Sequence, residues 1–584
     1  MATAITPDPT YSSFSGIDPL SRMWSSPLDR MMTPSFSTQR VETTHGSLVL
    51  YQSPSARTLR ELLELSVAVD PARPYIVQDD RVLLFGDLPS TVGGLAKHLR
   101  EVTGLAPGDR VAIAAANCIE WVITAWATVV NGAITVGLNS WWHPEEARQA
   151  LELTTPRVLV LDSHYFGLLE KHIPHLDFLD AVYVIGEVPS TSLDIQSLPT
   201  DLRADLPTDI AIDPDDIATL LFTSGTTGQA KAVQGTHRNA CSTFQNTQWM
   251  AAQYFPQVTL KPLQPVQHPT TVLTAPMFHV AGLQWGFLFP AATGTTVVLN
   301  TGRYKAEKAL RLAVESGATS LGGVPTTLMR ILDLPDLSSH DLHQIINVSW
   351  GGAPAPADLA QRCVDSFPNL ALVGTGYGLT ETCGLGLYAA GTELLDNPTT
   401  AGRTMPCVEM SIVTQEGHDA SPGEQGEVRM RGPIVMTGYW NNPEATSDAL
   451  SADGWFTTGD LGYVSEDGFL FLTGRKKEII IRGGENVYPV EIENVLRSAP
   501  GVVDAGVAGR AHPELGEEVV AYVQVEPDAT VTMESLQEHV RSHLAGFKVP
   551  TSIGIGQDVV PRNAAGKILR DAIAGGSLRF TQVL

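Results

Sequence analysis

The sequence predicts an α/β protein with a large N-terminal unit and a smaller α+β unit at its C-terminal end. From residue 58, short apolar strands alternate with helices, an order typical of a mostly parallel sheet covered on both faces. Beyond about residue 402, the strands are instead joined by glycine-rich turns. From residue 480 to 575, strands, one helix and a basic tail form a unit of roughly 100 residues, an ordinary domain size.

Length and composition indicate a globular protein of more than one domain. The chain has 584 residues, of which 43% are hydrophobic and 17% charged, so it can bury sizeable cores. Its formal net charge of -25 opposes general affinity for nucleic acid or for an anionic membrane. The five cysteines show no paired spacing, which suits neither a disulfide framework nor a metal site. We therefore expect a reducing, cytoplasmic location, with positive charge confined to ligand sites.

Two parts of the chain raise the question of targeting. Residues 1–55 are rich in Ser, Thr and Pro and lack the apolar stretch of a secretory signal, so we expect a weakly ordered extension. Residues 121–138 and 271–301 are uncharged, but Asn, Gly, Gln and Pro interrupt them. Buried helix and strand units are therefore expected there, and no integral membrane segment.

The elements of the N-terminal unit follow from hydrophobic periodicity and turn residues. The sequence predicts helices over 59–69, 88–105, 118–130 and 144–155, and strands over 75–78, 82–85, 110–114 and 158–161. Further along it predicts a strand over 217–222, followed by a segment at 295–299 and a helix over 305–316. In the C-terminal unit it predicts strands over 502–507 and 518–525 and a helix over 533–544.

The predicted strand 217–222 opens into a run of hydroxyls and glycines that ends near a lysine. Glycine frees the backbone to curl, and curled amides beside hydroxyl groups form a concave nest for an anion. The run consists of Thr223, Ser224, Gly225, Thr226, Thr227 and Gly228, followed by Lys231. A flexible linker is the alternative reading, but a linker would not directly follow a strand and lead to a lysine. The sequence thus predicts a polyphosphate site whose spacing differs from that of the Walker P-loop.

Later motifs complete a pattern that can be matched to a family. They are Gly376-Tyr-Gly-Leu-Thr-Glu381, Thr458-Gly-Asp460, Gly474-Arg-Lys-Lys-Glu478 and Pro561-Arg-Asn-Ala-Ala-Gly-Lys567. With the nest, they occur in the order and spacing of the adenylate-forming superfamily, and the chain resembles its acyl-CoA synthetase branch from about residue 58 to 572. The resemblance implies parallel sheets sandwiched by helices, a β-barrel-like subdomain, and a small mobile C-terminal domain. The boundaries expected are 56–475, a hinge at 476–479, 480–575 and a tail at 576–584.

The resemblance implies a two-step reaction with ATP, Mg²⁺ and coenzyme A. A carboxylic acid, either a medium- or long-chain fatty acid or an aryl acid, attacks the α-phosphate of ATP and releases pyrophosphate. The thiol of coenzyme A then displaces AMP from the acyl-adenylate. Because a carboxylate repels a triphosphate, the site has to neutralise charge in the transition state. An acyl-AMP ligase that loads a carrier protein, and a non-catalytic nucleotide-binding relative, are the alternatives.

The resemblance assigns nucleotide roles to residues in each motif. Residues 223–228 and Lys231 would hold the β- and γ-phosphates, Thr380 would contact the α-phosphate, and Glu381 would hold Mg²⁺. Tyr377 would stack on adenine, with Ala353 and Gly376 close to the nucleotide, and Asp460 with Arg475 would bind ribose. Each residue also has an alternative interpretation without a ligand. Glu381 would be a charge at a helix N-terminus, Tyr377 a core side chain, and Asp460 a turn residue.

The C-terminal motifs are implied to supply the moving parts. Lys567 would bridge the carboxylate and the α-phosphate during adenylation, although an isolated lysine is usually a solvated charge. Lys477 lies at the implied hinge, where the C-terminal unit would rotate between half-reactions. Gly483 and Gly484 would line the pantetheine path. Lys476, Arg482 and Lys548 could equally bind the coenzyme's phosphates or be solvated.

The acid pocket is expected between residues 276–282, 324–327 and 350–353. His279 occupies a place where acyl- and aryl-CoA ligases often carry a histidine near the carboxylate, whereas a lone histidine is more often a satisfied core residue. No aspartate stands near it to hold an α-amino group, which disfavours amino acids. The side chains expected to line an apolar slot are Phe278, Trp285, Leu328 and Trp350. Ala230 and Ala232 depart from the family's usual Pro and Gly around the nest lysine.

Overall fold

Two large sheets form the N-terminal unit. The computed structural model describes residues 35–43, 46–223, 230–263, 266–302, 304–482, 485–562 and 567–575. The seven-stranded sheet has the order β11 (Lys231–Thr236), β10 (Ile217–Thr223), β6 (Ile134–Gly137), β5 (Arg110–Ala114), β7 (Val158–Leu161), β8 (Ala181–Val184) and β9 (Gln196–Ser197). It is parallel except for the antiparallel pair of β10 and β11 at one edge.

The second sheet carries most of the cavity described below. Its nine strands have the order β18 (Arg403–Thr404), β17 (Gly384–Ala390), β16 (Leu372–Leu379), β15 (Asn347–Gly351), β14 (Ser320–Gly323), β12 (Thr270–Leu273), β13 (Thr296–Leu299), β3 (Pro74–Gln78) and β4 (Arg81–Leu84). The strands from β16 to β3 are parallel, and antiparallel pairs close both edges. Alternation of short strands with helices therefore predicted the sheets correctly.

Helices cover both sheets and fill the space between them. They are α3 (Leu59–Glu64), α4 (Leu88–Thr103), α5 (Ile119–Val130), α6 (Pro144–Thr154), α7 (Ser163–Leu169), α8 (His237–Trp249), α9 (Phe255–Val258), α10 (Val280–Leu283), α11 (Phe289–Thr293), α12 (Ala306–Glu315), α13 (Pro325–Leu332), α14 (Leu359–Ser366), α15 (Gly391–Asp396) and α16 (Pro443–Ala449). Two π-helical turns, η4 (Met250–Tyr254) and η5 (Gln284–Leu288), interrupt the helical runs that follow α8 and α10.

The largest core lies between the two sheets. Helix α5 is buried on every side, as expected for a helix that is apolar all round. Its Trp121 and Trp126 are fully buried, and both rings meet the edge of Phe287 at centroid distances of 5.5 and 5.7 Å. Across the described residues, no helix combines the length and apolar character needed to cross a membrane.

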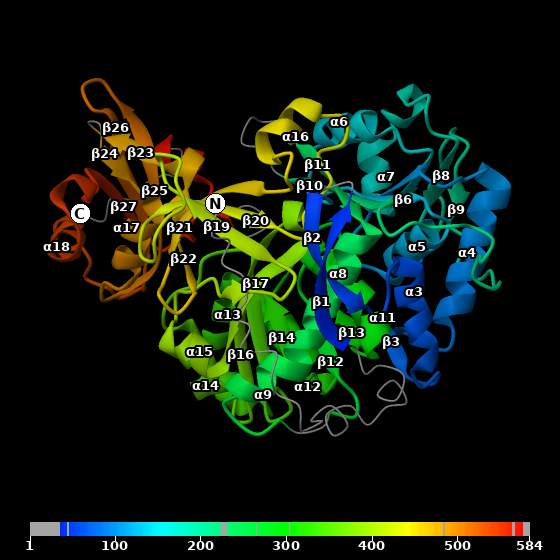
Figure 1. The fold of residues 1–584 in the computed structure, drawn as a ribbon, viewed down its shortest axis with the longest axis horizontal. Coiled ribbons are helices and arrows are strands. Elements are labelled where there is room, and N and C mark those ends of the chain that lie inside the picture. Colours follow the sequence, from blue (N-terminus) through cyan, green and yellow to red (C-terminus); the bar gives the residue numbers. More distant parts are fainter. Residues whose placement is uncertain are drawn as a thin grey trace.

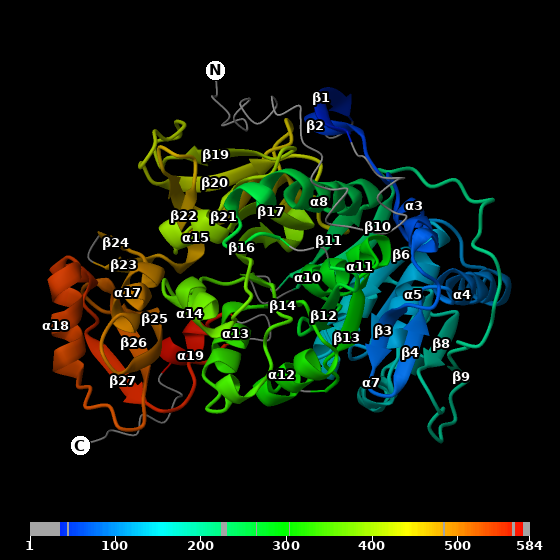
Figure 2. The ribbon, with the colours of Figure 1, turned by 90° about the horizontal axis from the view of Figure 1, so that it is seen from below.

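Two smaller sheets lie beyond the large ones. The region expected to be barrel-like holds an antiparallel sheet of β19 (Glu409–Val413), β20 (Gly426–Arg431), β21 (Phe456–Val464) and β22 (Leu470–Arg475). The C-terminal unit comprises β23 (Ile480–Arg482), β24 (Glu485–Val487), α17 (Pro489–Arg497), β25 (Val502–His512), β26 (Gly516–Val525), α18 (Met533–His543), β27 (Ser552–Gly556) and α19 (Arg570–Ala574). Figures 1 and 2 show this unit at one end of the molecule and the seven-stranded sheet at the other.

The expectation of weak order up to residue 55 is wrong for the end of that stretch. Strands β1 (Ser35–Thr43) and β2 (Gly46–Ser53) form an antiparallel hairpin. Arg40 forms an ion pair with Glu409 at 2.7 Å, and the buried Tyr51 hydroxyl donates to Asn246 Oδ1 at 2.7 Å. The many Ser and Thr residues hid the apolar face of β2, which only packing against the rest of the chain stabilises.

His237 gives the protein a pH-dependent stability. The Leu59 amide donates to His237 Nδ1 at 3.1 Å, and burial together with Arg60 lowers the pKa of this fully buried histidine to about 3. The unfolded chain takes up this proton near pH 6.5, while the folded chain stays neutral, so the free energy of unfolding falls as the pH falls. We expect His237→Asn to reduce that slope by about 1.4 kcal/mol per pH unit between about pH 6 and pH 5.

Urea unfolding of wild type and variant at several pH values measures this slope. His343→Asn is the control, because that side chain is 68% exposed beside Asp341. Equal slopes for wild type and His237→Asn would contradict the assignment of the neutral form to His237.

Candidate active site

A single cavity joins the two units of the protein. Its volume is about 2920 Å³, which exceeds the roughly 300–1,000 Å³ of a usual small-molecule site, so more than one ligand fits. It begins at the C-terminal ends of β12 and β14 to β16, where ligands bind in open α/β sheets. Residues of the C-terminal unit, including Lys567, close its other side.

The residues of the predicted anion nest lie in the chain between β10 and β11. Thr223 ends β10 and pairs with Lys231, the first residue of β11, and both line the cavity. The residues between them that were predicted to bind phosphate, Ser224, Gly225, Thr226, Thr227 and Gly228, lie outside the described residues. The described strands thus bring both ends of this segment to the cavity wall.

Lys231 and Glu381 are linked through a tyrosine that the sequence did not single out. Lys231 Nζ lies 4.8 Å from the centre of the Tyr439 ring, a cation–π distance. The Tyr439 hydroxyl donates to Glu381 Oε1 at 3.0 Å, and burial and Glu381 raise the pKa of the tyrosine. Tyr439 thereby fixes the carboxylate near the lysine without neutralising either charge. No motif or spacing in the sequence marks Tyr439.

A one-turn helix positions Thr380 and Glu381. Turn η7 (Thr380–Thr382) follows β16 directly, and the Leu379 amide donates to Thr382 Oγ1 at 2.8 Å. The next residue, Cys383, has a φ of 44°, which reverses the chain into β17. Gln284 donates to the Cys383 carbonyl and secures the reversal. The turn places Thr380 and Glu381 in the cavity wall.

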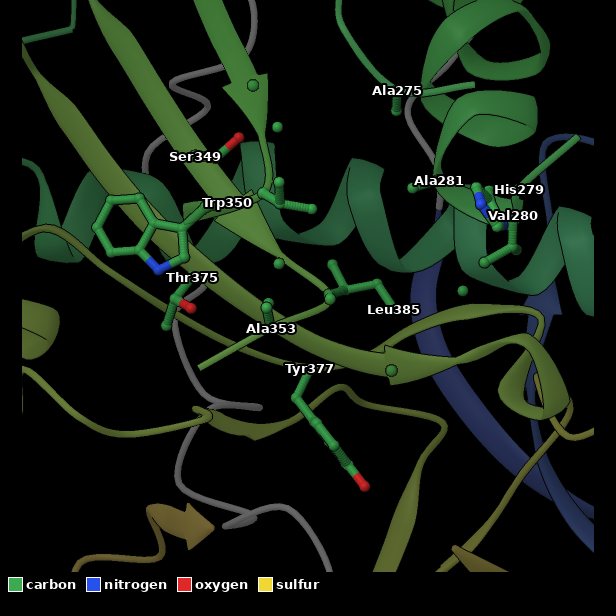
Figure 3. Close-up of a pocket in the computed structure, with 18 of the residues that line it drawn as sticks. Ala275, His279, Val280, Ala281, Ser349, Trp350, Ala353, Thr375, Tyr377 and Leu385 are labelled. Atoms are coloured by element: carbon green, nitrogen blue, oxygen red, sulfur yellow. The ribbon is translucent and has the colours of Figure 1, made fainter. Parts of the chain in front are cut away.

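Two glycines flatten the wall beneath Ala353. Gly351 of β15 pairs with Gly376 of β16. A Cβ at Gly351 would lie 2.8 Å from the Gly376 carbonyl oxygen, and a Cβ at Gly376 would lie 2.3 Å from Leu385. Larger residues would therefore push the strands apart or fill the cavity. Ala353 follows in the loop and lines the same wall (Figure 3).

Asp460 is the most constrained charged group of the site. It is 4% exposed, and its two carboxylate oxygens accept from different partners: Oδ2 from the Tyr377 hydroxyl at 2.6 Å and Oδ1 from Arg475 Nε at 2.7 Å. Burial and Asp460 hold the pKa of Tyr377 well above its usual value. Burial has the largest single effect and lowers the pKa of Arg475, but Asp460, Glu478 and other neighbouring groups together raise it above its usual value. Residues of three motifs thus meet at one carboxylate.

Lys567 enters this site from the C-terminal unit. Burial and Arg475 lower the pKa of its ammonium group, while Asp460 and Glu381 act in the opposite direction. Arg570 of α19, three residues on, donates to Glu478 Oε2 at 2.7 Å and ties this segment to the hinge turn. Lys567 and residues of the N-terminal unit therefore line the same cavity.

His279 lies at the start of α10 on the acid side of the cavity. Burial, followed by the charge of Lys567, lowers its pKa to about 4, so the imidazole is neutral at pH 7. Its Nε2 is buried and has no hydrogen-bond partner in the described part of the chain. Figure 3 shows His279 with Val280 and Ala281 facing the strand that carries Ser349 and Trp350.

The expected apolar slot is only partly correct. Trp285 and Trp350 line the cavity, but Phe278 and Leu328 do not. Phe278 is 3% exposed, and its ring packs between His279 and Trp141 at centroid distances of 4.5 and 5.3 Å. Leu328 is 1% exposed and belongs to the core beneath α12 and α13. Sequence proximity suggested a shared wall, whereas packing buries both side chains away from the cavity lining.

The structure describes only some of the residues that were predicted to form the hinge and to bind coenzyme A. Lys477 lies in the turn η8 (Lys476–Glu478) and lines the cavity, while Gly483 and Gly484 lie outside the described residues. Three cations that could have been solvated have protein partners: Lys476 pairs with Glu427 at 2.9 Å, Lys548 pairs with Glu491 at 2.6 Å, and Arg482 donates to the Phe547 carbonyl at 2.8 Å. The Lys476 pair joins the hinge to the N-terminal unit.

Comparison with known families agrees with this site. Residues 63–440 match the AMP-binding enzyme family, and residues 491–567 match the AMP-binding enzyme C-terminal domain. The chain therefore belongs to the family of AMP-binding enzymes, whose match covers the nest, Tyr377, Glu381 and Lys567.

Relatives with assigned activities indicate which kind of AMP-binding enzyme this chain is. The chain is 32% identical to the methyl-dioxo-octahydro-indenyl-propanoyl:CoA ligase of Rhodococcus jostii, over 89% of this chain and 98% of that protein. It is 33% identical to feruloyl-CoA synthase of Amycolatopsis sp, over 84% of this chain and 93% of that protein. ATP-bound MatB of Rhodopseudomonas palustris shares its fold with a TM-score of 0.75 and 26% identity, over 89% of this chain and 98% of that one. This chain is accordingly an acyl-CoA synthetase, an AMP-forming acid–CoA ligase that uses ATP and coenzyme A.

Proposed function

We propose that the protein activates a carboxylic acid held between His279 and the second sheet, in a cavity it shares with ATP. One observation carries the proposal. The same cavity is lined by the Thr223 and Lys231 hairpin, by Asp460 and by Lys567 of the C-terminal unit. A triphosphate, a ribose and a carboxylate each meet groups of suitable charge there, and the volume accommodates ATP and an acid together.

In this proposal, positive charge gathers where the carboxylate attacks the α-phosphate. Lys567 bridges the two anions, Lys231 and residues 223–228 hold the departing pyrophosphate, and Thr380 donates to the α-phosphate. Asp460 accepts from the ribose hydroxyls with Arg475 beside it, and Tyr377 with Ala353 and Gly376 borders adenine. Neutral His279 orients the acid without adding charge. These roles rest on the family's motifs and on the proximity of the side chains.

Mg²⁺ enters as the partner of ATP. In the described residues no cluster of three or more His, Cys, Asp or Glu side chains could hold a metal ion alone. Glu381 supplies one carboxylate, which suits Mg²⁺ because this ion keeps several waters and phosphate oxygens as ligands. When bound, it would neutralise phosphate charge. Glu381 itself would do no more than orient the ion, with its own position fixed by Tyr439.

The thioester step requires the C-terminal unit to move. We propose rotation at residues 476–479, which withdraws Lys567 and opens a path along Gly483 and Gly484 for the thiol of coenzyme A. The acids named for the two relatives described above are a dioxo bicyclic propanoate and ferulate, which favours a ring-bearing acid for this chain over an amino acid. The five cysteines are all buried and unbridged, in keeping with a cytoplasmic location.

The test is a panel of fatty, aryl and bicyclic acids incubated with ATP and Mg²⁺, first alone and then with coenzyme A. We expect acid-dependent pyrophosphate release without coenzyme A, and acyl-CoA detected by mass spectrometry when it is added. A holo acyl carrier protein in place of coenzyme A is the comparison arm. If the acyl product forms only on the carrier protein, the carrier and not coenzyme A is the acceptor. Failure of every acid to release pyrophosphate would overturn the proposal.

A further inference from the structure

The deep part of the cavity runs along one face of the second sheet. Side chains alternate across a strand, so one set faces an apolar core and the other faces the cavity. The core set consists of Val272, Leu321, Val348 and Val373, all buried. The cavity set includes Thr271, Ser320, Asn347 and Ser349. Parallel sheets are normally apolar on both faces, so this polar wall is unusual.

Strand register arranges these polar side chains in two rows. Ser320 of β14 pairs with both Thr271 of β12 and Asn347 of β15, which places the three side by side. Ser349 lies one row nearer the nucleotide end, flanked by the glycines 322 and 374 of the neighbouring strands. The two rows are roughly 7 Å apart, because each residue of a strand rises about 3.3 Å. Figure 3 shows Ser349 and Trp350 leaving the strand in different directions.

Tyr388 of β17 adds a hydroxyl to the row of Ser349. It pairs with Gly376, and its ring lies over Gly374, where a Cβ would come within 2.0 Å of the hydroxyl oxygen. The ring is held by Phe255 and Tyr254 at centroid distances of 6.0 and 6.5 Å. Packing therefore fixes the ring while the hydroxyl faces the cavity.

Four of these polar groups have side chains that could bind a ligand. Over the described residues, Ser320, Asn347, Ser349 and Tyr388 have no side-chain hydrogen-bond partner, although all four line the cavity. The Tyr254 hydroxyl next to Tyr388 shows the contrast, since it donates to Glu393 at 2.7 Å and accepts from the Ala390 amide at 2.9 Å. An alkyl chain packed against the four groups would remove their water and give nothing in return.

We propose that the acid used by this enzyme carries a hydroxyl or carbonyl oxygen remote from its carboxylate, and that the two polar rows bind it. This inference rests on the proposed function and names its substrate class. The row of Ser349 and Tyr388 binds an oxygen nearer to the carboxylate of the acid, and the row of Ser320 and Asn347 binds one farther from it. An unsubstituted fatty acid is then a poor substrate.

Matched pairs of acids test this inference. Phenylpropanoate is compared with its para-hydroxy derivative, and decanoate with its ω-hydroxy derivative, by kcat/KM for pyrophosphate release. We expect the oxygenated member of at least one pair to be favoured by about tenfold or more, because a site built for hydrogen bonds rejects analogues that lack them. Equal use of both members, or preference for the unsubstituted acid in both pairs, would overturn the inference while leaving the ligase assignment intact.

Variants test whether the two rows of polar side chains cause the preference for oxygenated acids. Tyr388→Phe removes one oxygen from a packed ring, and Asn347→Leu removes the deeper amide at similar size. Each variant should bring the ratio of kcat/KM between the oxygenated and unsubstituted acids of its pair toward one. Tyr254→Phe is the control, since its hydroxyl is bonded within the protein, and should leave the ratios unchanged. Calorimetric affinities of the corresponding acyl-sulfamate analogues give the same comparison without turnover. Ratios that persist in both variants would remove these residues from substrate recognition.

Discussion

Lys567→Ala is expected to lower the rate of acyl-AMP formation on the order of a thousandfold and to leave thioester formation from preformed acyl-AMP nearly unchanged. Lys567 lies in the cavity with Asp460, Glu381 and Arg475, and its charge also depresses the pKa of His279. Adenylation brings two anions together at this position, whereas the second half-reaction begins after pyrophosphate has left. The side chain is therefore needed in one half-reaction only.

Pyrophosphate release measures the first half-reaction, and acyl-CoA formed from synthetic acyl-AMP measures the second. Arg541→Ala is the matched control, since it removes a half-exposed cation of the same unit whose ion-pair partner, Glu538, lies on its own helix. Comparable loss in both half-reactions would show that Lys567 supports the fold or the hinge rather than adenylation.

Asp460→Asn is expected to raise the KM for ATP by on the order of a hundredfold and to lower the free energy of unfolding by about 2 kcal/mol. Both carboxylate oxygens accept from donors, Tyr377 on one side and Arg475 on the other. An amide places its NH₂ against one of these donors and leaves Arg475 without an opposite charge. The binding surface for ribose and the packing of β21 against β22 are then affected together.

Initial rates at varied ATP concentration and urea unfolding separate these two effects. Glu409→Gln provides the comparison, because Glu409 is likewise buried and pairs with Arg431 and Arg40, but lies outside the cavity wall. It should lose stability with little change in the KM for ATP. An unaltered KM in Asp460→Asn would exclude Asp460 from nucleotide binding.

Local patterns predicted the parts of the site that are continuous in the chain. The apolar run before Thr223 predicted β10, and the hydroxyl and glycine run after it predicted the end of that strand, because glycine and the change in polarity weaken extended structure. The motifs around Glu381, Asp460 and Lys567 were found for the same reason, and their resemblance to a family supplied the roles. The hairpin of β1 and β2 was not predicted, because its stability depends on distant partners such as Glu409.

Contacts between distant segments were beyond the reach of those patterns. Tyr439, which connects Lys231 with Glu381, carries no local signal, since its position depends on the bridge between Val233 and Tyr439. The alternation in Asn347-Val-Ser-Trp-Gly351 could have indicated a polar cavity face, but not that Tyr388 would reach the same row. Phe278 and Leu328 were misplaced because apolarity alone does not say which wall a side chain joins.

By itself, the sequence determined the α/β class, the activation of an acid by ATP and the groups that carry charge, because these depend on residue types at short spacing. Only the tertiary structure decided which uncharged polar side chains face the cavity and which charges share a partner. Strand register and the approach of the C-terminal unit set those contacts, and both arise from packing between segments far apart in the chain.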